Sequence, residues 1–556
     1  MYRTEKLRCL NKEVRLNEYY NTTGIGLVMD SITIDKAGYL LNWEICNSDG
    51  DFAKGTTVEE LISYLNKVKS ELHLTKKSNK NRDVLVIYTT NLDQVYGFLH
   101  KYDESGMLFG KYYYDFLDVF EFRDIKLFST KIENDAKVIA EFAQELIDEV
   151  FIPNKYFYIT PTQYVTKKIK KSCKRHKDTT AVDIYPQTPN EYKNLFKAYF
   201  GGICVCNYPG LTVEDHIAEY DRTSAYIYDM LIEKHVCEPL QDVDTEWYQY
   251  YIDEEDNYFS VGLYELTCSG LHKGAYVFKD INGNRLEPDK TVYLTLTNTD
   301  LILLNKLCRI DTCKCLSLKI AKKDYLPQYL REVIEEQYIE KVKNPTKINK
   351  IKVNSIYGAT VKKIDIDDFT IEKHNATLAP QWGILTTSYA RKNLLELAYR
   401  IKTWLYSDTD SIYCKIDAKN KLMIDVYNLK VHQKVKEYCK KFDLDFELFK
   451  DLGQFKLKNK ICKFKANGKK QYMYTLEDGK FVFKGSGING KNDESAYEGK
   501  IDTGYKTIGH ISDEVSETYI EGKYYKSNGS YYTNKETDMN IIRGELFLSK
   551  LLKQRR

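Results

Sequence analysis

Short apolar runs and one amphipathic stretch organise the beginning of the chain. Residues 24–29 (Gly-Ile-Gly-Leu-Val-Met) and 84–88 (Val-Leu-Val-Ile-Tyr) are apolar segments of strand length, a pattern typical of buried strands. Residues 133–150 repeat apolar side chains at helical spacing and carry acidic residues in the first turn, which predicts an amphipathic helix. Strands that alternate with a helix predict an α/β domain over residues 1–165.

The pattern changes beyond this first domain. Residues 166–190 are basic and dotted with Thr and Pro, so we expect a linker there. From about residue 191, short strands and helices mix without a regular βαβ rhythm, which favours an α+β organisation. Because 556 residues exceed the size of a single hydrophobic core, several domains are expected.

The composition is that of a globular chain, with 43% hydrophobic and 29% charged residues. No stretch approaches the roughly 20 apolar residues of a membrane span, and the N-terminus lacks the apolar run of a secretory signal. We therefore expect a cytoplasmic protein, in the host cytoplasm if the chain is viral, with no membrane partner. The thirteen Cys include no C-x-x-C pair, which favours reduced thiols over disulfides or a zinc ribbon.

Basic and acidic side chains nearly cancel, at 83 and 80, and leave a net charge of +3. This balance excludes a protein held to nucleic acid by bulk charge alone, but it allows a local basic channel. Two lysine-rich runs, at 167–177 and 456–470, could line such a channel. For either run alone, a solvated face is the simpler explanation.

Two carboxylates one residue apart mark the segment 406–413 (Tyr-Ser-Asp-Thr-Asp-Ser-Ile-Tyr). The flanking residues predict a hairpin with Asp408 and Asp410 at its tip. Like charges this close are costly unless cations lie beside them. Two Mg²⁺ ions would offset that cost and would activate a hydroxyl for attack on a phosphate. An ordinary acidic turn is the alternative, because Asp and Ser are common turn residues.

A further carboxylate is expected from a different strand. Residues 216–221 predict a strand that ends at Asp221, and the residues from Arg222 to Tyr226 predict a turn into a helix. The first backbone N–H groups of such a helix, near Ser224, suit a triphosphate. The ring of Tyr226 could then stack under a sugar and exclude a 2′-hydroxyl. A helix cap at Asp221 or Ser224 explains the same residues.

The segment 350–358 predicts a helix with a polar stripe. At about 3.6 residues per turn, Lys350, Asn354 and Tyr357 share one face. A cation, an amide and a ring on one stripe fit a nucleotide, with Lys350 on the phosphate and Tyr357 against the base pair. Gly358 is expected to end the helix or to let the base approach closely. A solvated helix face with a glycine cap is the alternative.

In chain order, the segments 221–226, 350–358 and 406–413 resemble motifs A, B and C of the family B DNA polymerases. Residues 199–202 (Tyr-Phe-Gly-Gly) resemble the Y-x-G-G element of that family, and residues 470–472 (Lys-Gln-Tyr) resemble its K-x-Y motif. Residues 386–391 resemble the helix that precedes the motif C hairpin. The long segment between motifs A and B looks like the first terminal-protein-region insertion of the protein-primed branch.

The resemblance implies a DNA polymerase that extends a primer 3′-hydroxyl with dNTPs and is able to start on a separate terminal protein. It implies a monomer on DNA primer–template and two Mg²⁺ ions, which Mn²⁺ could replace. The implied catalytic and metal-binding residues are Asp221, Arg222 (through its carbonyl), Asp408 and Asp410. The implied nucleotide-binding residues are Ser224, Tyr226, Lys350, Asn354 and Tyr357. The implied primer- and DNA-binding residues are Tyr199, Gly201, Gly202, Arg391, Thr409, Lys470 and Tyr472.

Members of this family carry a 3′–5′ exonuclease in the N-terminal domain, built from D-x-E, N-x-x-x-F-D and Y-x-x-x-D elements. Here Ile32 replaces the Glu of the first element, Val95 stands where the second needs a carboxylate, and Lys131 replaces the Tyr of the third. A two-metal site that lacks so many oxygens should bind metal poorly. We therefore expect a retained exonuclease fold with weak or no proofreading. The remaining candidate residues are Asp30, Asn91, Asp93 and Asp135.

The implied architecture is an α/β plus α+β multidomain chain, a right-hand polymerase with an RNase H-like exonuclease domain. The expected parts are the exonuclease-like domain (1–165), a basic linker (166–190), the first part of the palm (191–240), a first terminal-protein-region-like insertion (241–328), fingers (329–360), a short second insertion (361–385), the second part of the palm (386–505) and a thumb (506–556).

Two other functions fit parts of the sequence. One is a nucleic-acid-binding protein that keeps the polymerase fold without synthesis, and the intact aspartates and Lys350 argue against it. The other is an RNA-templated polymerase, since reverse transcriptases also place paired aspartates on a hairpin. Those enzymes typically show a Tyr-x-Asp-Asp order, whereas Thr409 separates the two acids here.

Overall fold

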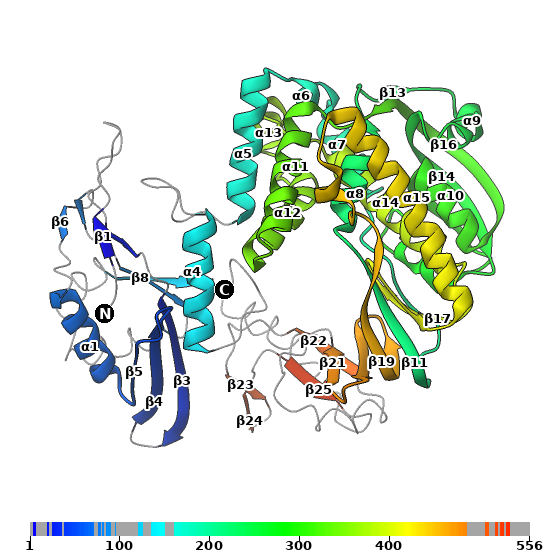
Figure 1. The fold of residues 1–556 in the computed structure, drawn as a ribbon. Coiled ribbons are helices and arrows are strands. Elements are labelled where there is room, and N and C mark those ends of the chain that lie inside the picture. The colour runs from blue at the N-terminus through cyan, green and yellow to red at the C-terminus, as the bar shows by residue number, and fades with distance from the viewer. Residues whose placement is uncertain are drawn as a thin grey trace. The chain divides into compact units, whose positions relative to one another are not determined.

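The structure is a computed structural model of the chain (Figure 1). The chain divides into two units, the first of residues 1–168 and 340–356 and the second of residues 169–339 and 357–556. Each unit has its own sheet and hydrophobic core. The residues that the structure describes are 4–6, 19–21, 25–35, 38–71, 76–78, 81–82, 85–90, 95, 120–125, 135–150, 161–485, 506–510, 517–520, 523–526 and 530–533.

A five-stranded mixed sheet forms the centre of the first unit. Its central strand β3 (Ile25–Asp35) pairs antiparallel with β4 (Gly38–Asn47) and parallel with β8 (Leu85–Thr89). The outer strands are β5 (Phe52–Gly55), beside β4, and β9 (Phe120–Asp124), beside β8. The two predicted apolar strands are therefore confirmed as β3 and β8, and they are direct neighbours.

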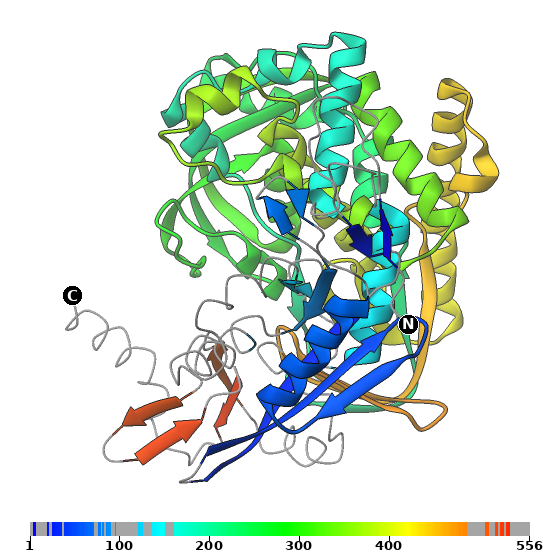
Figure 2. The ribbon, with the colours of Figure 1, turned by 90° about the vertical axis from the view of Figure 1, so that its left-hand side faces the viewer.

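Helices cover both faces of this sheet. On one face, Trp43 of β4 contacts Tyr64 of α1 (Val58–Glu71), with ring centroids 6.0 Å apart. On the other face, Cys46 of β4 packs in a core with α4 (Ala136–Val150). Figures 1 and 2 show the sheet between these two helices. An α/β layer arrangement follows, as the sequence pattern predicts.

Helix α4 confirms the helix predicted at 133–150, but it begins at Ala136. The side chain of Asp135 accepts a hydrogen bond from the backbone N–H of Val138 at 3.0 Å. This aspartate therefore caps the helix and fixes its start. Short strand pairs complete the described part of the unit: β1 (Thr4–Lys6) with β2 (Tyr19–Asn21), and β6 (Lys76–Ser78) with β7 (Asn81–Arg82).

The prediction of a linker at 166–190 was wrong at the level of secondary structure. The stretch is helical and forms most of α5 (Pro161–His176), all of α6 (Thr180–Ile184) and the start of α7 (Pro189–Phe196). Val165, Ile169 and Cys173 recur every fourth residue and are buried. Because lysines dominate the composition between these positions, the apolar stripe is hard to recognise in the sequence. The burial of this stripe holds the helix in place.

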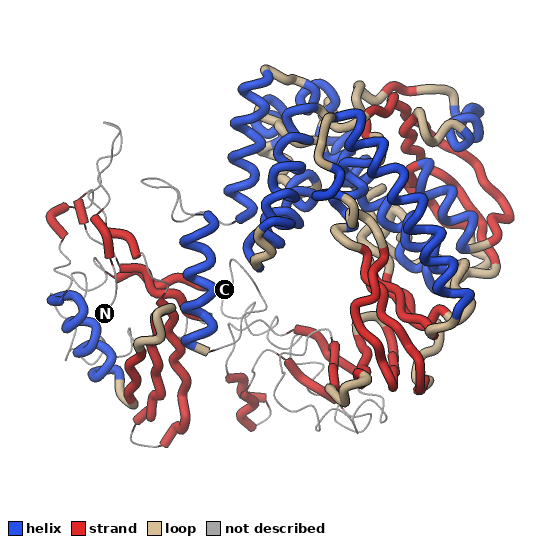
Figure 3. The backbone as a smooth tube through the Cα atoms, in the orientation of Figure 1, coloured by secondary structure: helices blue, strands red, loops and turns tan. Residues whose placement is uncertain are grey.

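A seven-stranded sheet with all neighbours antiparallel forms the centre of the second unit. Its strands, red in Figure 3, mix with helices without a regular alternation, which confirms the α+β prediction. In sheet order, the strands are β10 (Cys204–Cys206), β17 (Trp404–Asp408), β18 (Ser411–Lys415), β11 (Thr212–Arg222), β19 (Phe455–Gly468), β20 (Gln471–Leu476) and β21 (Phe481–Gly485).

The two faces of this sheet differ. Ile412 and Cys414 face a core that also holds Leu304 of α10 (Asn298–Leu307) and Leu394 of α14 (Pro380–Ala398). Their neighbours in the strands alternate to the opposite face. That face carries a cluster of aromatic side chains, which are Tyr406, Tyr413, Phe464, Tyr472 and Tyr474.

The predicted insertion at 241–328 contains most of a second sheet. Strands β14 (Tyr258–Ser269), β15 (Thr291–Thr297) and β16 (Arg309–Asp324) pair antiparallel, with β14 in the middle. Two short strands, β12 (His235–Val236) and β13 (Gln241–Asp242), pair with β16. Near this sheet lie η2 (Thr245–Trp247) and α9 (Tyr248–Asp253), whereas η3 (Lys273–Val277) lies beside β10 and α10.

Helix α12 (Lys347–Thr360) confirms the helix predicted at 350–358, but it continues past Gly358, so this glycine does not end it.

None of the helices within the described residues is both long and apolar enough to cross a membrane. Every cysteine in that part of the chain is free, and most are buried. The remaining helices among the described residues after 224 are α8 (Ala225–Ile232), α11 (Gln328–Lys343), α13 (Phe369–His374), α15 (Ala418–Phe442) and α16 (Phe446–Phe449). Four short strands follow: β22 (Lys506–His510), β23 (Glu517–Ile520), β24 (Lys523–Lys526) and β25 (Ser530–Thr533).

Candidate active site

Three adjacent strands of the seven-stranded sheet bring the predicted aspartates together. Ser411 of β18 pairs with Asp408 of β17 on one side and with Asp221 of β11 on the other. The side chains of these three residues therefore form a row across the sheet, at the ends of their strands. Asp410 lies in the turn between β17 and β18. The predicted strand ending at Asp221 and the predicted hairpin are both confirmed.

Backbone hydrogen bonds hold the tip of the hairpin in place. Thr409 adopts a left-handed conformation (φ 63°), and its N–H donates to the carbonyl of Ile203 at 2.8 Å. The N–H of Asp410 donates to the carbonyl of Asp408 at 2.7 Å, and the carbonyl of Asp410 accepts from the N–H of Arg222 at 2.8 Å. The turn is thus tied to the strand on each side, which fixes where its carboxylates point.

Electrostatics distinguish Asp410 from the other carboxylates. Burial first, and then the nearby charge of Asp221, raise the pKa of Asp410 to about 6. Lys458 opposes this effect and Asp408 adds to it. The cluster therefore carries more negative charge than its surroundings neutralise.

Two residues that the sequence analysis did not assign to the site, Lys458 and Glu219, interact with it. Lys458 Nζ lies 3.0 Å from Glu219 Oε1 and 3.4 Å from Asp221 Oδ1. Glu219 is buried and also accepts a hydrogen bond from Asn459 Nδ2 at 2.5 Å. The signal for Glu219 was its place two residues before Asp221 in a strand, which puts both on one face. No local signal singled out Lys458 within its basic run.

The donor chemistry of the aspartate cluster suits a hard divalent cation. Asp221, Asp408 and Asp410 offer carboxylate oxygens, the ligands that Mg²⁺ prefers. A bound cation would neutralise the excess negative charge that Asp221 and Asp408 place around Asp410. Among the described residues, no group of three or more His, Cys, Asp and Glu side chains already stands in the arrangement of a metal site.

The side chain of Arg222 stabilises the turn that follows β11. It is buried, and its guanidinium forms an ion pair with Asp229 of α8, at 2.8 Å and 3.0 Å. It also donates to the carbonyl of Gly453 at 3.3 Å. Ser224, the predicted triphosphate contact, stands at the start of α8 in a left-handed conformation (φ 48°). The predicted turn into a helix is therefore confirmed.

Three tyrosines from three predicted motifs meet beside the aspartates. The rings of Tyr226 and Tyr357 stack with centroids 4.0 Å apart and an interplanar angle of 18°. Burial, with a smaller contribution from the neighbouring Tyr357, raises the pKa of Tyr199 well above the usual value. Burial, with a smaller contribution from Asp410, also raises the pKa of Tyr226 to about 12. The three hydroxyls therefore stay protonated at neutral pH.

The segment from Tyr199 to Gly202 packs directly on the hairpin tip. A Cβ atom on Gly202 would lie only 2.8 Å from Cγ2 of Thr409, so glycine is needed for this close approach. Gly201 is exposed. The segment thus borders the aspartates on the side of β17, where its predicted contact with DNA stays a prediction.

A direct DNA contact by Arg391 is contradicted by its burial. The side chain is fully enclosed, and it makes bidentate hydrogen bonds with Asp300 at 2.7–3.0 Å. Its remaining donors bind the carbonyls of Phe200 and Gly201. Arg391 therefore anchors the segment 199–202 from beneath, because a guanidinium with five donors can hold a carboxylate and a loop together.

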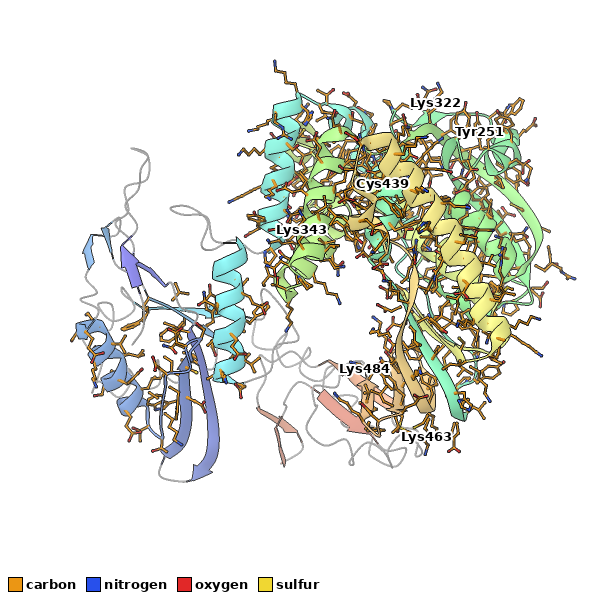
Figure 4. All side chains as sticks on the ribbon, viewed as in Figure 1. Tyr251, Lys322, Lys343, Cys439, Lys463 and Lys484 are labelled. Atoms are coloured by element: carbon orange, nitrogen blue, oxygen red, sulfur yellow. The ribbon has the colours of Figure 1, made fainter. Side chains whose placement is uncertain are left out.

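The predicted K-x-Y pair occupies the hairpin between β19 and β20. Tyr472 is mostly buried, and its ring centroid lies 4.7 Å from that of Tyr406. Lys470 is exposed, and its backbone N–H donates to the hydroxyl of Tyr406 at 2.8 Å. Figure 4 shows the side chains of this region, with Lys463 on β19 and Lys484 on β21 labelled.

Comparison with known proteins gives a match at the level of structure. No family model and no curated protein matches the sequence. Phi29 DNA polymerase in complex with primer-template DNA matches with a TM-score of 0.57 at 14% identity, over 92% of this chain and 100% of that chain. The chain has the fold of phi29 DNA polymerase. The predicted resemblance to protein-primed family B DNA polymerases is thereby confirmed for the fold.

Two further structures of phi29 DNA polymerase agree. Its ternary complex with primer-template DNA and incoming nucleotide substrates matches with a TM-score of 0.54 at 15% identity, over 92% of this chain and 99% of that chain. Its complex with single-stranded DNA matches with a TM-score of 0.54 at 14% identity, over 92% and 100%.

The other predicted residues belong to the first unit of this phi29-like fold. Lys350 and Asn354 are exposed and lie one turn apart on α12. Asp30 lies on β3, and Asp135 is the cap of α4, so Asp135 has a structural role whether or not it has a catalytic one. Asn91 and Asp93 lie outside the described residues.

Proposed function

We propose that this protein is a template-directed DNA polymerase that adds deoxynucleotides to a primer 3′-hydroxyl. The observation that carries the proposal is the clustering of Asp221, Asp408 and Asp410 at the ends of neighbouring strands and in the turn between two of them, in a phi29-like fold. Phi29 DNA polymerase has been solved with primer-template DNA and incoming nucleotide. We infer the same classes of substrate for this chain.

Asp221, Asp408 and Asp410, with the carbonyl of Arg222, would hold two Mg²⁺ ions, which Mn²⁺ could replace. When bound, such ions lower the pKa of an attacking hydroxyl and neutralise charge on the displaced phosphate. The protein's own contribution is to fix the carboxylates through the hydrogen bonds of the hairpin tip. Preorganisation of this kind removes the need to rearrange charges during the reaction.

The stacked rings of Tyr226 and Tyr357 would form one wall of the nucleotide site. A ring held flat at this position leaves no room for a 2′-hydroxyl, so Tyr226 would select deoxyribose. Ser224 and the first N–H groups of α8 would receive the triphosphate. Lys350 and Asn354 would add a cation and an amide from α12.

Lys470 and Tyr472 would hold the primer terminus, with Thr409 and the segment 199–202 beside them. The exposed ammonium of Lys470 suits a phosphate, whereas the buried Tyr472 supports the turn from below. In this assignment the seven-stranded sheet is the palm, α11 and α12 are the fingers, and the chain after residue 505 is the thumb.

We further propose that synthesis can start on the hydroxyl of a separate terminal protein. The shared fold with phi29 DNA polymerase and the sheet formed by the segment 241–328 support this part of the proposal. The first unit would be an exonuclease-like domain with little or no proofreading. Mg²⁺-dependent excision of a mismatched 3′ end, lost in Asp30→Ala, would overturn that expectation.

Primer extension tests the central proposal. The wild-type protein should extend a 5′-labelled primer on a longer DNA template with Mg²⁺ and dNTPs. The Asp408→Ala/Asp410→Ala variant should lose extension by at least about a thousandfold, since both metal-facing carboxylates are gone. Asp425→Asn, on the exposed side of α15, serves as the matched control and should keep full activity. Absence of extension by the wild type on every primer–template would contradict primer-dependent synthesis.

A further inference from the structure

Lys458 occupies an irregular position in its strand. Along β11 and β19, Glu219 pairs with Asn459 and the next residue, Tyr220, pairs with Leu457. Lys458 is therefore the extra residue of a β-bulge. A bulge changes the direction of the side chain that it carries, and such bulges are frequent next to active sites. Here the bulge turns Lys458 toward the face that bears the aspartates.

The redirected ammonium bridges two carboxylates of β11. Its Nζ lies 3.0 Å from Glu219 Oε1 and 3.4 Å from Asp221 Oδ1. Glu219 has only 3% of its surface exposed, so its charge needs a partner. Asp221 is more open, with 39% of its side chain exposed. The lysine therefore holds Glu219 closely and reaches Asp221 only at the edge of hydrogen-bonding distance.

Lys456, two residues earlier on the same strand, provides a natural comparison. It pairs with Asp221 in the backbone register, yet its ammonium lies 2.5 Å from Asp451 and not on the aspartate cluster. The side chains of Lys456 and Lys458 have similar exposure, 49% and 52%. The position of Lys458 on the cluster thus follows from the bulge and not from the density of lysines in the strand.

We propose that Lys458 is a built-in counter-cation of the active site: it pairs with Asp221 until a divalent cation binds there, and thereby sets the affinity for that cation. This inference rests on the proposed metal-dependent polymerase function and adds a positioning residue to it. On cation binding, Lys458 would release Asp221 and keep Glu219. The lysine would also keep Asp221 oriented before the cation arrives, so only the ammonium, and not the carboxylate, would have to move on binding.

Titration of the full-length protein with Mn²⁺ tests this proposal, with the electron paramagnetic resonance signal of the free ion as the measure of unbound Mn²⁺. Binding that is present in the wild type and absent in Asp221→Asn is assigned to the aspartate cluster. Lys458→Met should bind Mn²⁺ about tenfold more tightly at this site, because the positive charge that pairs with Asp221 is gone. In EDTA the same variant should unfold at a lower temperature than the wild type, because Glu219 loses its partner, and added Mn²⁺ should narrow that gap.

Two variants control for structural damage. Lys458→Arg keeps the charge and should bind Mn²⁺ within about threefold of the wild type. Lys456→Met removes a lysine of equal exposure from the same strand and should leave Mn²⁺ binding unchanged. Unchanged or weaker binding by Lys458→Met would overturn the proposal and leave the proposed polymerase function intact. If the wild type shows no binding that depends on Asp221, both the counter-cation role and the metal-dependent mechanism fail.

Discussion

Asp410 shows how a single residue reports on the charge of the whole cluster. Its carboxylate is shielded from solvent and stands near Asp221 and Asp408, and both effects favour the protonated form. The unfolded chain offers neither effect. The difference between the two states makes the stability of the protein depend on pH, in a direction opposite to that of a salt-bridged aspartate.

We expect the metal-free protein to lose stability as the pH rises from about 4 to 6. In this window the unfolded chain has released the proton of Asp410 near its ordinary pKa of 3.8, whereas the folded chain keeps it until about pH 6. The folded state binds more protons there, so the free energy of unfolding should fall with pH, by about 2 kcal/mol for this residue. Chemical denaturation in EDTA at several pH values measures the effect. Asp410→Asn should lack it, and identical pH profiles for the two proteins would argue against the raised pKa.

Gly202 lies so close to the hairpin tip that a larger residue should displace it. Gly202→Ala should slow primer extension at least about tenfold, because its methyl group would meet Cγ2 of Thr409 at 2.8 Å and displace the turn that carries the aspartates. The double variant Gly202→Ala/Thr409→Ser removes that methyl partner and should recover part of the rate. Single-turnover extension assays measure both. A Gly202→Ala protein as fast as the wild type would show that the tip tolerates displacement.

At the scale of elements, the ion pair between Asp300 of α10 and Arg391 of α14 joins two helices beneath the active site. Both side chains are fully buried. Thr297 and Ser388 donate further hydrogen bonds to the same carboxylate at 3.1 Å and 2.7 Å. Such a network stabilises a structure only while it is complete, since each partner left alone is a buried charge.

Removal of one partner should therefore be severe. Arg391→Met or Asp300→Asn should lower the free energy of unfolding of the second unit by about 3–5 kcal/mol. The double variant should cost less than the sum of the two single ones, because it leaves no full charge buried. Denaturant titrations monitored by fluorescence provide the measurement. Strict additivity would mean that the two residues act independently.

The sequence predicted the local elements of the site well. Strand, turn and helix around Asp221, the hairpin at Asp408 and Asp410, and the helix of Lys350 are each encoded by short-range patterns. Contacts between segments far apart in the chain could not be predicted from the sequence. The stack of Tyr226 on Tyr357 and the burial of Arg391 against Asp300 depend on where whole elements pack. The same reason explains the linker error, because the apolar stripe of α5 gains meaning only from the core that covers it.

At the scale of the whole molecule, charge is nearly balanced overall and concentrated locally. The strand β19 and the turn after it carry a run of lysines without acidic residues between them. Affinity for DNA that depends on a few such lysines should decrease steeply with salt. In a protein whose entire surface is basic, by contrast, affinity is spread over many weak contacts, so that the loss of one lysine is compensated by others.

Loss of Lys470 should reveal one of these contacts. Lys470→Ala should weaken binding to primer–template DNA about tenfold, and the slope of log affinity against log salt should become shallower by about 0.9, the value for one phosphate contact. Fluorescence anisotropy titrations at salt concentrations between about 50 and 200 mM give both the affinity and its salt dependence. Lys430→Ala, an exposed lysine on α15, should change neither. An unchanged slope for Lys470→Ala would remove this residue from the DNA interface.

The strand order of the central sheet also bears on how the protein is made. Strand β11 lies between β18 and β19, and both neighbours follow much later in the chain, from Ser411 and Phe455 onward. Strands β14, β15 and β16, by contrast, pair among themselves within residues 258–324. During synthesis the inserted sheet can close as soon as its strands emerge, while β11 waits without a partner. A ribosome that stalls before Ser411 would thus release a chain with a folded insertion and no active site.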